Sequence, residues 1–435
     1  MSPDDPVPAT PAQQRLWVLA EMRPGDPFYN IPFAVDITGP LRTPALERAL
    51  DDVVRRHPPL RTTFRRHGSE LLAQTSDAPR PATPLVDLAD LAETHRERRA
   101  AELAAEFAGR PFDLGTGPLL RTLLLRLAPD THRLLVNVHH IVFDGQSLEV
   151  FLTELLSRYE EHLKPTPADP PPLPTGVADV ARARQAARER GGAAEALRYW
   201  TARLAGAPEV MELPISAARP AETRHEAAYR SRLIPQEVLE PLRRLARGNR
   251  ATMFMVLKAA CDVLLRQHGA RDVVMGLALS GRDSTDQAGL IGYLAQPVVQ
   301  RQEFTGDPTF RELLARVRAD VLDAHEHPEL PFEAVLQALG VAHDPSYYPL
   351  YQVMFGYQPR QPVRRAVRSS PCPTCACPPP RSSWSSPWPR PRTGWTPRSA
   401  TGPTCSTPRR SSRCSPACTP CWSASARTRT PGCRS

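Results

Sequence analysis

Residues 139–145 read HHIVFDG, and this stretch decides the fold of the chain. The residues before it, 133–138 (RLLVNV), are mostly β-branched or aliphatic, which is typical of a strand. The residues after it, 147–163 (SLEVFLTELLSRYEEHL), repeat apolar side chains at helical spacing. We therefore expect the motif at a turn from a strand into a helix.

The two histidines of the motif are expected to face different surroundings. Neighbouring side chains on a strand point to opposite faces, so one imidazole faces a cavity and the other faces the packing behind it. We assign the cavity side to His140 and the packing side to His139. An imidazole, with an ordinary pKa of about 6.5, either accepts a proton from a nucleophile or holds an attacking amine by a hydrogen bond.

Asp144 follows the end of the strand, where two roles are open to it. It orients the imidazole, or it forms a buried ion pair with a distant arginine. We favour the ion pair, with Arg282 or Arg61 as the partner. Gly145 has no Cβ, so a substrate carbonyl can approach its backbone N–H, where an oxyanion develops. The candidate catalytic residues are therefore His139, His140, Asp144 and Gly145.

Histidine pairs also occur in metal sites and as satisfied core residues. A zinc site needs further ligands, and the helix predicted after the motif has no HExxH pattern. Eight of the nine cysteines lie in residues 359–435, far from the histidines along the chain. We therefore expect no metal at the motif.

At these residues the chain resembles a condensation domain of a nonribosomal peptide synthetase, within the HHxxxDG acyltransferases whose fold is that of chloramphenicol acetyltransferase. The resemblance extends to further segments, which stand in the family's order. They are TPAQQRLWVL (10–19), PFYNIPFAV (27–35), RRHPPLRTTF (55–64), LRYWTARLAGAP (197–208), GLALSGRD (276–283), LIGYLAQPVVQR (290–301), HPELPFEAVL (327–336) and DPSYYPLYQVMFGYQ (344–358).

The chain departs from the family pattern at three places. Gln296 stands where the family usually has asparagine, Pro58 stands at an acidic position, and the element at residues 177–181 is degraded. Epimerising relatives tend to have tryptophan where this chain has Leu148, and cyclising relatives have aspartate where it has His139. The resemblance therefore favours condensation over both variants, and it is greater to the subtype that joins two L-configured residues.

The resemblance implies an α/β (α+β) fold of two chloramphenicol acetyltransferase-like lobes, set in a V with the active site in the tunnel between them. It also implies a reaction in which an amine on one carrier protein attacks the acyl thioester on another, forming an amide (peptide) bond. Phosphopantetheine arms would present both substrates, so no cofactor is bound directly. The implied partners are peptidyl or acyl carrier proteins and the adenylation domains of a synthetase.

The chain is too long, at 435 residues, for one ordinary core. A proline-rich stretch at residues 164–175, KPTPADPPPLPT, predicts an extended connector. We therefore place an N-terminal lobe at residues 1–170 and a C-terminal lobe at residues 171–358.

In the C-terminal lobe, residues 239–268 predict two helices that are split near Gly248. Apolar Met255, Leu257 and Leu264 are expected to pack into the lobe. Cys261 lies in the same apolar run, so we assign it to packing rather than to chemistry.

No targeting or membrane segment is expected. The first residues, MSPDDPVPATPAQQ, are acidic and proline-rich, without the positive start and apolar core of a signal peptide. No apolar run approaches the length that spans a bilayer. We therefore expect a cytoplasmic protein that does not bind membranes.

The composition changes abruptly at residue 359. Residues 359–435 have no Asp, Glu, Lys, Leu, Ile, Phe or Tyr, and a folded core is not built without those apolar side chains. Fourteen arginines also lie there, and without them the formal net charge changes from +9 to −5. The basic balance of the whole chain therefore gives no support to nucleic-acid binding.

Three explanations of residues 359–435 compete: a disordered basic tail, a cysteine-rich disulfide or metal module, and translation in a wrong reading frame. The cysteine module lacks the histidines that often complete a metal site. Read from the third base of each codon onward, residues 393–408 permit a string with YGTDLFDA, and residues 417–423 permit LHTLLV. Both strings resemble closing segments of condensation domains. We favour a frameshift between Gly356 and Pro371, which leaves the C-terminal lobe incomplete.

Three functions follow from these observations. The leading one is a condensation domain that forms peptide bonds between carrier-bound substrates. The first alternative is a free-standing acyltransferase that acts on a soluble alcohol or amine. The second alternative is an inactive truncated remnant, which the composition of the tail favours and the intact motif argues against.

Overall fold

The computed structural model describes residues 6–76, 82–214, 230–327, 332–341, 344, 346–358 and 367–370. At residues 332–333 and 367–370 it describes the backbone alone. The expected closing segments at residues 393–408 and 417–423 lie outside the described residues.

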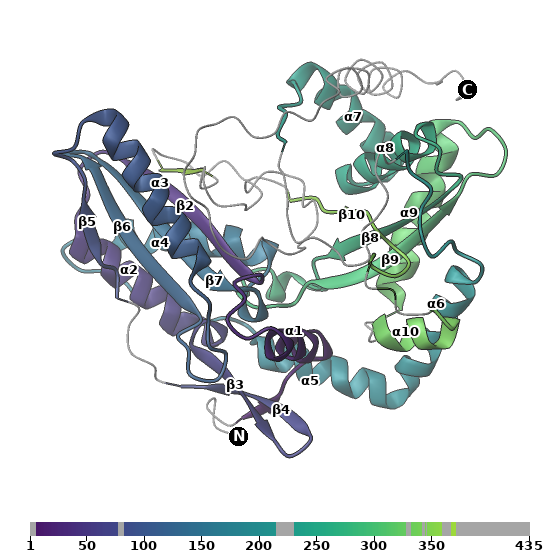
Figure 1. The fold of residues 1–435 in the computed structure, drawn as a ribbon, viewed down its shortest axis with the longest axis horizontal. Coiled ribbons are helices and arrows are strands. Elements are labelled where there is room, and N and C mark those ends of the chain that lie inside the picture. Colours follow the sequence, from purple (N-terminus) through teal and green to yellow (C-terminus); the bar gives the residue numbers. More distant parts are fainter. Residues whose placement is uncertain are drawn as a thin grey trace.

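The first lobe, drawn on the left in Figure 1, is built on a five-stranded sheet. Its strand order is β11-β2-β7-β6-β5, and every pair is antiparallel except the parallel pair β5 and β6. A second, three-stranded sheet has the order β1-β4-β3. The strands are β1 (Val7–Pro8), β2 (Asn30–Thr38), β3 (Thr62–His67), β4 (Glu70–Thr75), β5 (Leu85–Asp87), β6 (Leu120–Ala128), β7 (Thr131–His139) and β11 (Val367–Ser370).

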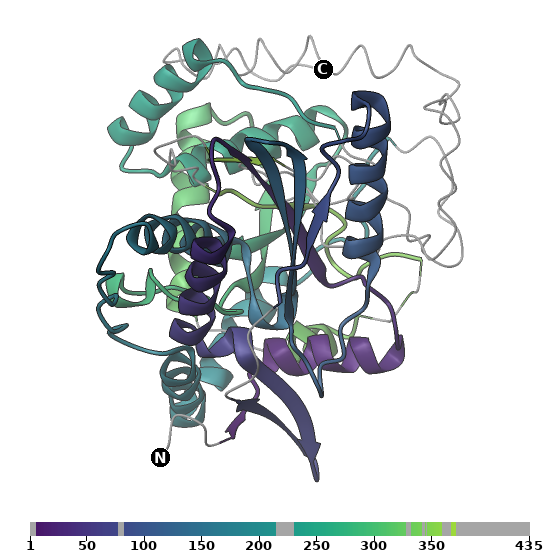
Figure 2. The ribbon, with the colours of Figure 1, turned by 90° about the vertical axis from the view of Figure 1, so that its left-hand side faces the viewer.

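Helices cover both faces of the five-stranded sheet because its central strands are apolar on both sides. On β6, Leu124 faces the core that contains α2 and α4, whereas the next residue, Leu125, faces the core that contains α3. Figure 2 shows α3 lying alongside the sheet. The helices of this lobe are α1 (Pro11–Met22), α2 (Thr43–Arg56), η1 (Pro58–Arg61), α3 (Glu93–Gly109), η2 (His140–Val142) and α4 (Gly145–His162).

The second lobe has a smaller sheet with the order β10-β8-β9, in which β9 is an edge strand of the described residues. Its strands are β8 (Asp272–Leu279), β9 (Gln296–Glu303) and β10 (Met354–Phe355). Its helices are α5 (Val177–Ala187), the short π-helix η3 (Arg188–Gly192), α6 (Ala193–Leu204), α7 (Gln236–Gly248), α8 (Met253–Gln267), η4 (Thr285–Gln287), α9 (Phe310–Glu326) and α10 (Phe332–Leu339).

The helices predicted for the second lobe are confirmed. Helix α7 ends at Gly248 and α8 begins at Met253, as the split near Gly248 predicts. Met255 is buried, whereas Leu257 and Leu264 are only partly buried. Cys261 packs against the core formed by β8.

The proline-rich connector runs between α4 and α5 and is fastened to the first lobe. Arg158 of α4 donates to the carbonyl oxygen of Ala168 at 2.6 Å, and Arg56 of α2 donates to that of Pro171. Arg158 also pairs with the buried carboxylate of Asp52 at 2.7 Å. Side chains of the first lobe therefore hold the connector at two of its carbonyl groups.

Strand β11 changes the expected domain organisation at one point. Residues 359–435 were expected to contribute no folded element, yet residues 367–370 pair antiparallel with β2, with Val367 opposite Ile37 and Ser370 opposite Ala34. This strand extends the sheet of the first lobe, although it follows the second lobe in sequence. The division at residues 170 and 358 otherwise stays a prediction.

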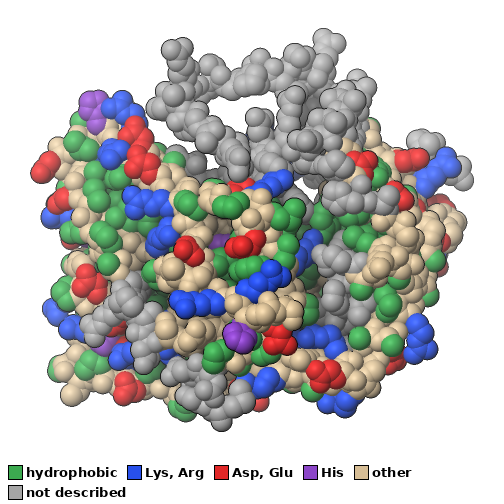
Figure 3. Space-filling view, turned by 60° about the horizontal axis from the view of Figure 1, so that its bottom comes forward, with side chains coloured by type: hydrophobic (Ala, Val, Ile, Leu, Met, Phe, Trp, Pro, Cys, Tyr) green, Lys and Arg blue, Asp and Glu red, His purple; other side chains and the backbone are tan. Residues whose placement is uncertain are grey.

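Charged groups of both signs are interspersed on the molecular face shown in Figure 3. This face does not gather Lys and Arg side chains into one region. Within the described residues, none of the helices is both long enough and apolar enough to cross a membrane.

A fully buried ion pair lies inside the second lobe, on α8. Lys258 Nζ donates to Asp262 Oδ2 at 2.7 Å, and both side chains are 0% exposed. Burial raises the pKa of Asp262 to about 6, against the lowering effect of Lys258. The second carboxylate oxygen, Oδ1, is buried without a hydrogen-bond partner. The desolvation of this pair is therefore incompletely offset.

We expect Lys258→Met to lower the free energy of unfolding by about 3–5 kcal/mol, because it leaves Asp262 buried without its partner. The double variant Lys258→Met/Asp262→Leu is expected to be at least as stable as the parent. Stability of the parent should also fall as the pH rises from 3.8 to about 6, because the folded state binds the proton of Asp262 more tightly. Urea unfolding measures all three effects.

The control is Arg243→Ala, which removes an exposed ion pair with Glu240 on α7. It should change stability by less than about 1 kcal/mol. A double variant as unstable as Lys258→Met would contradict the prediction.

Candidate active site

The strand β7 ends at His139, and its imidazole is enclosed by the first lobe. His139 Nδ1 accepts a hydrogen bond from the backbone N–H of Ile141 at 3.1 Å. The rings of Tyr29 and Phe112 flank the imidazole, with centroids 6.3 and 6.1 Å away. Burial, and then the proximity of His140, lowers the pKa of His139 to about 3. His139 is therefore a neutral core residue.

His140 is the first residue of the short helix η2, and it is half-buried. Its Nδ1 lies 2.8 Å from the carbonyl oxygen of Phe143. A carbonyl oxygen only accepts, so Nδ1 carries the proton and the lone pair of the neutral ring is on Nε2. Burial lowers the pKa of His140, and the charge of Asp144 only partly counters this effect. The imidazole is therefore neutral at neutral pH, as a proton acceptor must be.

The two histidines do face different surroundings, but for a different reason from the one predicted. Strand alternation would require both to lie on β7, whereas the strand ends at His139 and His140 starts a turn of 3₁₀-helix. The change of backbone conformation separates the two side chains.

The carboxylate of Asp144 lies between the two lobes and is almost completely buried. Arg282, from the segment after β8, donates to Oδ2 through Nη1 at 2.9 Å and to Oδ1 through Nη2 at 3.1 Å. Burial acts to raise the pKa of Asp144, but the charge and hydrogen bonds of Arg282 outweigh it and the pKa is lowered. The ion pair predicted with Arg282 is confirmed.

Asp144 is also the N-cap of α4. Its Oδ1 accepts from the backbone N–H of Ser147 at 2.9 Å and from Ser147 Oγ at 2.8 Å. Its Oδ2 accepts from the backbone N–H groups of Leu294 and Ala295 at 3.0 and 3.1 Å. With the two bonds from Arg282, the carboxylate accepts six hydrogen bonds, and its arrangement is that of a structural anion rather than of a base.

Residues 290–295 connect the second lobe to the first, and we call them the crossing segment. Ile291 is fully buried in the core of the first lobe. Ser147 Oγ lies 3.0 Å from both the carbonyl oxygen and the nitrogen of Gly292. The crossing segment is therefore fixed by Asp144 and Ser147 together.

Gly281, beside Arg282, is required by a close approach to the crossing segment. Its φ is +61°, a conformation that L side chains rarely adopt, and a Cβ there would lie 1.8 Å from the carbonyl oxygen of Leu294. Arg184 of α5 donates to the carbonyl oxygen of Gly281 at 2.5 Å. Only glycine at residue 281 allows Arg282 to reach Asp144 in this arrangement.

The other arginine predicted as a partner of Asp144 was wrong. Arg61 donates to the carbonyl oxygens of Ser76 and Arg55, at 3.1 and 3.4 Å, and it is not among the donors to Asp144. Arg61 belongs to η1 at the start of β3, so its guanidinium serves the smaller sheet.

Gly145 is the first residue of α4, at the helix end where backbone N–H groups give a positive partial charge. The predicted role of its N–H as an oxyanion donor stays a prediction, as do the tunnel and the expectation that no metal takes part.

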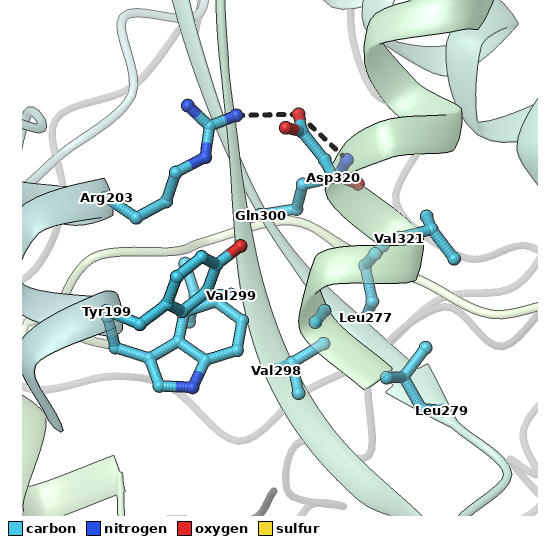
Figure 4. A pocket seen from close by; sticks show the side chains of 11 residues that line it. Tyr199, Arg203, Leu277, Leu279, Val298, Val299, Gln300, Asp320 and Val321 are labelled. Atoms are coloured by element: carbon cyan, nitrogen blue, oxygen red, sulfur yellow. Dashed lines mark hydrogen bonds and ion pairs between the residues drawn. The ribbon is translucent and has the colours of Figure 1, made fainter. Parts of the chain in front are cut away.

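A small hollow in the second lobe, shown in Figure 4, is a rival candidate site. It lies between α6, β8, β9 and α9, and its polar groups include an ion pair of Arg203 with Asp320 at 2.6 Å. Gln300 donates to the same carboxylate at 3.3 Å. The polar groups bond mainly to one another, and no motif residue lines the hollow, so we interpret it as imperfect packing.

Sequence reasoning missed Ser147, Tyr293 and the backbone N–H groups of Leu294 and Ala295. Ser147 could have been found, because an aspartate three residues before a serine at the start of a helical pattern is typical of a cap. The backbone donors leave no signal in the sequence.

Known proteins share the motif and the segments around it. A model of the condensation domain family matches residues 4–369. The chain belongs to the condensation domain family. The match covers both lobes and ends inside the interval in which the frameshift is expected.

Among curated proteins, a synthetase of Brevibacillus parabrevis that belongs to linear gramicidin synthase is 39% identical over 356 residues. Phosphinothricin tripeptide synthetase PhsC of Streptomyces viridochromogenes is 38% identical over 356 residues. The alignments cover 82% and 81% of this chain but only 5% and 33% of those proteins. This condensation domain is therefore similar to a small part of much longer synthetases.

Solved structures share the fold. The crystal structure of the X-domain from teicoplanin biosynthesis superimposes with a TM-score of 0.69 at 29% identity, covering 85% of this chain and 82% of that chain. The first condensation domain of the CDA synthetase superimposes with a TM-score of 0.68 at 21% identity, covering 87% and 91%. These likenesses confirm the expected α/β fold of the chloramphenicol acetyltransferase type.

Two departures from the family pattern have neighbours in this structure. In the amide orientation that satisfies both groups, the side-chain oxygen of Gln296 accepts from Arg184 at 3.1 and 3.2 Å. Val177 begins α5, and its Cγ2 lies 2.7 Å from where a Cβ on Gly292 would be. Both residues therefore support the elements that hold the crossing segment.

We expect Asp144→Ala to lower the free energy of unfolding by about 3–5 kcal/mol, because Arg282 would be left buried without its partner. Urea unfolding measures the loss. The matched control is Asp283→Ala, the neighbour of Arg282, whose side chain is 60% exposed and lies 3.7 Å from Arg184. It should change stability by less than about 1 kcal/mol. An Asp144→Ala variant that is as stable as the parent but inactive would assign Asp144 a direct chemical role.

Proposed function

We propose that this condensation domain forms an amide bond between a donor acyl thioester and an acceptor amine in nonribosomal peptide biosynthesis. Carrier proteins would present both groups on phosphopantetheine arms. The observation that carries the proposal is the state of His140. Its Nδ1 proton is held by the carbonyl oxygen of Phe143, so a neutral imidazole with its lone pair on Nε2 stands at the motif of an acyltransferase family.

In this reaction the amine nitrogen attacks the carbonyl carbon of the thioester, and the carbon–sulfur bond breaks. The amine loses a proton, and the departing thiolate takes one up. Nε2 of His140 is suited to accept the proton of the amine or to hold the amine by a hydrogen bond. The N–H of Gly145, at the positive end of α4, is suited to stabilise the oxygen of the tetrahedral intermediate.

The other motif residues serve the arrangement rather than the proton transfer. Asp144 accepts six hydrogen bonds and its pKa is lowered, so it is a poor proton acceptor at neutral pH. His139 is enclosed and neutral. The proposal therefore assigns acid–base chemistry to His140 alone among the four motif residues.

The proposed partners are peptidyl or acyl carrier proteins and the adenylation domains of a synthetase in the cytoplasm. The synthetases to which the chain is similar support this proposal. No cofactor would be bound directly, since the phosphopantetheine arrives with the substrates.

The composition of residues 359–435 leads to a prediction about the coding DNA. Between codons 350 and 435, another reading frame is expected to continue the condensation pattern, including a segment similar to YGTDLFDA. Nucleotide sequencing across these codons, read in three frames, tests it. Early stop codons in the other frames would exclude a frameshift and favour the inactive remnant.

We expect His140→Ala to lower the rate of condensation by about 10²–10⁴-fold, because the proton acceptor is lost. Two carrier proteins loaded with an acyl donor and an aminoacyl acceptor serve as substrates, and mass spectrometry of the acceptor carrier measures the product. Because burial lowers the pKa of His140, kcat/KM should be constant above its ordinary pKa of 6.5 and should decrease only at lower pH.

The control is His95→Ala, which changes an exposed histidine on α3. Unchanged condensation by His140→Ala would remove the catalytic assignment. Transfer of the acyl group to a free amine, with no transfer to the acceptor carrier, would favour the free-standing acyltransferase.

A further inference from the structure

Tyr293, in the crossing segment, packs against the imidazole of His140. The two ring centroids are 4.8 Å apart and the planes are inclined at 62°, an edge-to-face arrangement. His140 comes from the first lobe, whereas Tyr293 follows η4 of the second lobe. The second lobe therefore contributes an aromatic side chain in contact with the proposed proton acceptor.

The backbone on both sides of Tyr293 is fixed. Gly292 is bonded to Ser147 Oγ through its nitrogen and its carbonyl oxygen, each at 3.0 Å. The N–H groups of Leu294 and Ala295 donate to Asp144. Tyr293 thus lies between two anchored residues, and the position of its Cα is set by the same carboxylate that pairs with Arg282.

Further tyrosines lie around Tyr293. The rings of Tyr348 and Tyr351 are 4.7 Å apart, and Arg15 of α1 donates to the hydroxyl of Tyr348. Burial raises the pKa of Tyr29 and of Tyr351, and the nearby phenol of Tyr293 adds to both shifts. The phenols of Tyr29 and Tyr351 therefore stay protonated at neutral pH, and the cluster limits the space into which Tyr293 could turn.

The ring of His140 needs this support because the hydrogen bond of Nδ1 fixes it incompletely. The bond from Nδ1 to the carbonyl oxygen of Phe143 selects the tautomer, but the imidazole can still tilt about that bond, since a torsion at a planar ring has broad minima. The ring of Tyr293 contacts His140 and opposes the tilt.

We propose that Tyr293 is a positioning residue for His140, and that Asp144 acts on the imidazole from the opposite lobe through Tyr293. The proposal rests on the proposed function only in taking His140 as the proton acceptor. It gives Asp144 an effect on His140 although the hydrogen bonds that its carboxylate accepts come from Arg282, Ser147, Leu294 and Ala295.

The first test does not depend on activity. In the full chain labelled with ¹⁵N-histidine, the signals of His140 are assigned by their loss in His140→Ala. In the parent we expect one tautomer, with Nδ1 protonated. In Tyr293→Leu we expect a mixture of tautomers or exchange-broadened signals, because the imidazole can tilt. Tyr293→Phe keeps the ring and should match the parent.

The second test uses the condensation assay on the same variants. Tyr293→Leu should lower kcat by about 10- to 100-fold, since a small displacement of a catalytic group has an effect of this size. KM should stay within about twofold, because the substrates are held elsewhere. Tyr293→Phe should restore the parental kcat.

The matched control is Tyr347→Leu, whose hydroxyl donates to Glu209 at 3.3 Å in the second lobe. It should leave the His140 signals and kcat unchanged, and thermal unfolding should show that all variants are folded. Parental His140 signals in Tyr293→Leu would overturn the proposal, and so would a Tyr293→Phe variant that behaves like Tyr293→Leu. If the signals change as expected but no variant and no parent forms product, the proposed function fails and the positioning role stands.

Discussion

The structure depends on one buried carboxylate, that of Asp144. A charge enclosed by protein is tolerated only when other groups replace the water it has lost, and here Arg282, Ser147 and two backbone N–H groups do so. These donors come from a helix of the first lobe and from two segments of the second. Satisfying the charge therefore requires the lobes to adopt one relative arrangement.

The site separates a charged structural group from a neutral chemical group. Asp144 keeps its charge because Arg282 and the N–H groups stabilise it, whereas burial keeps the imidazoles of His139 and His140 uncharged. The few residues from His140 to Asp144 contain this change, across a turn of 3₁₀-helix and the start of α4. A short turn thus places a proton acceptor next to an anion that does not compete with it for protons.

The strand, the turn and the helix around the motif could be predicted because each depends on local sequence. The partner of Asp144 could be reduced to two arginines, but only the structure excludes Arg61, which serves the smaller sheet. The crossing segment was recognised only as a family segment, since its N–H groups donate from the backbone and any residue can supply them. Strand β11 could not be predicted, because its pairing with β2 joins residues more than three hundred positions apart.

This pairing bears on recombination between relatives. A single exchange at the proline-rich connector would replace everything after it, including β11, and so would place a foreign edge strand on the sheet of the recipient's first lobe. The Asp144 contacts would tolerate such an exchange better, because two of the donors are backbone groups that relatives supply in the same way. A chimera that preserves both lobes therefore needs two junctions, one in the connector and one before Val367, so that each sheet keeps the strands of its own parent.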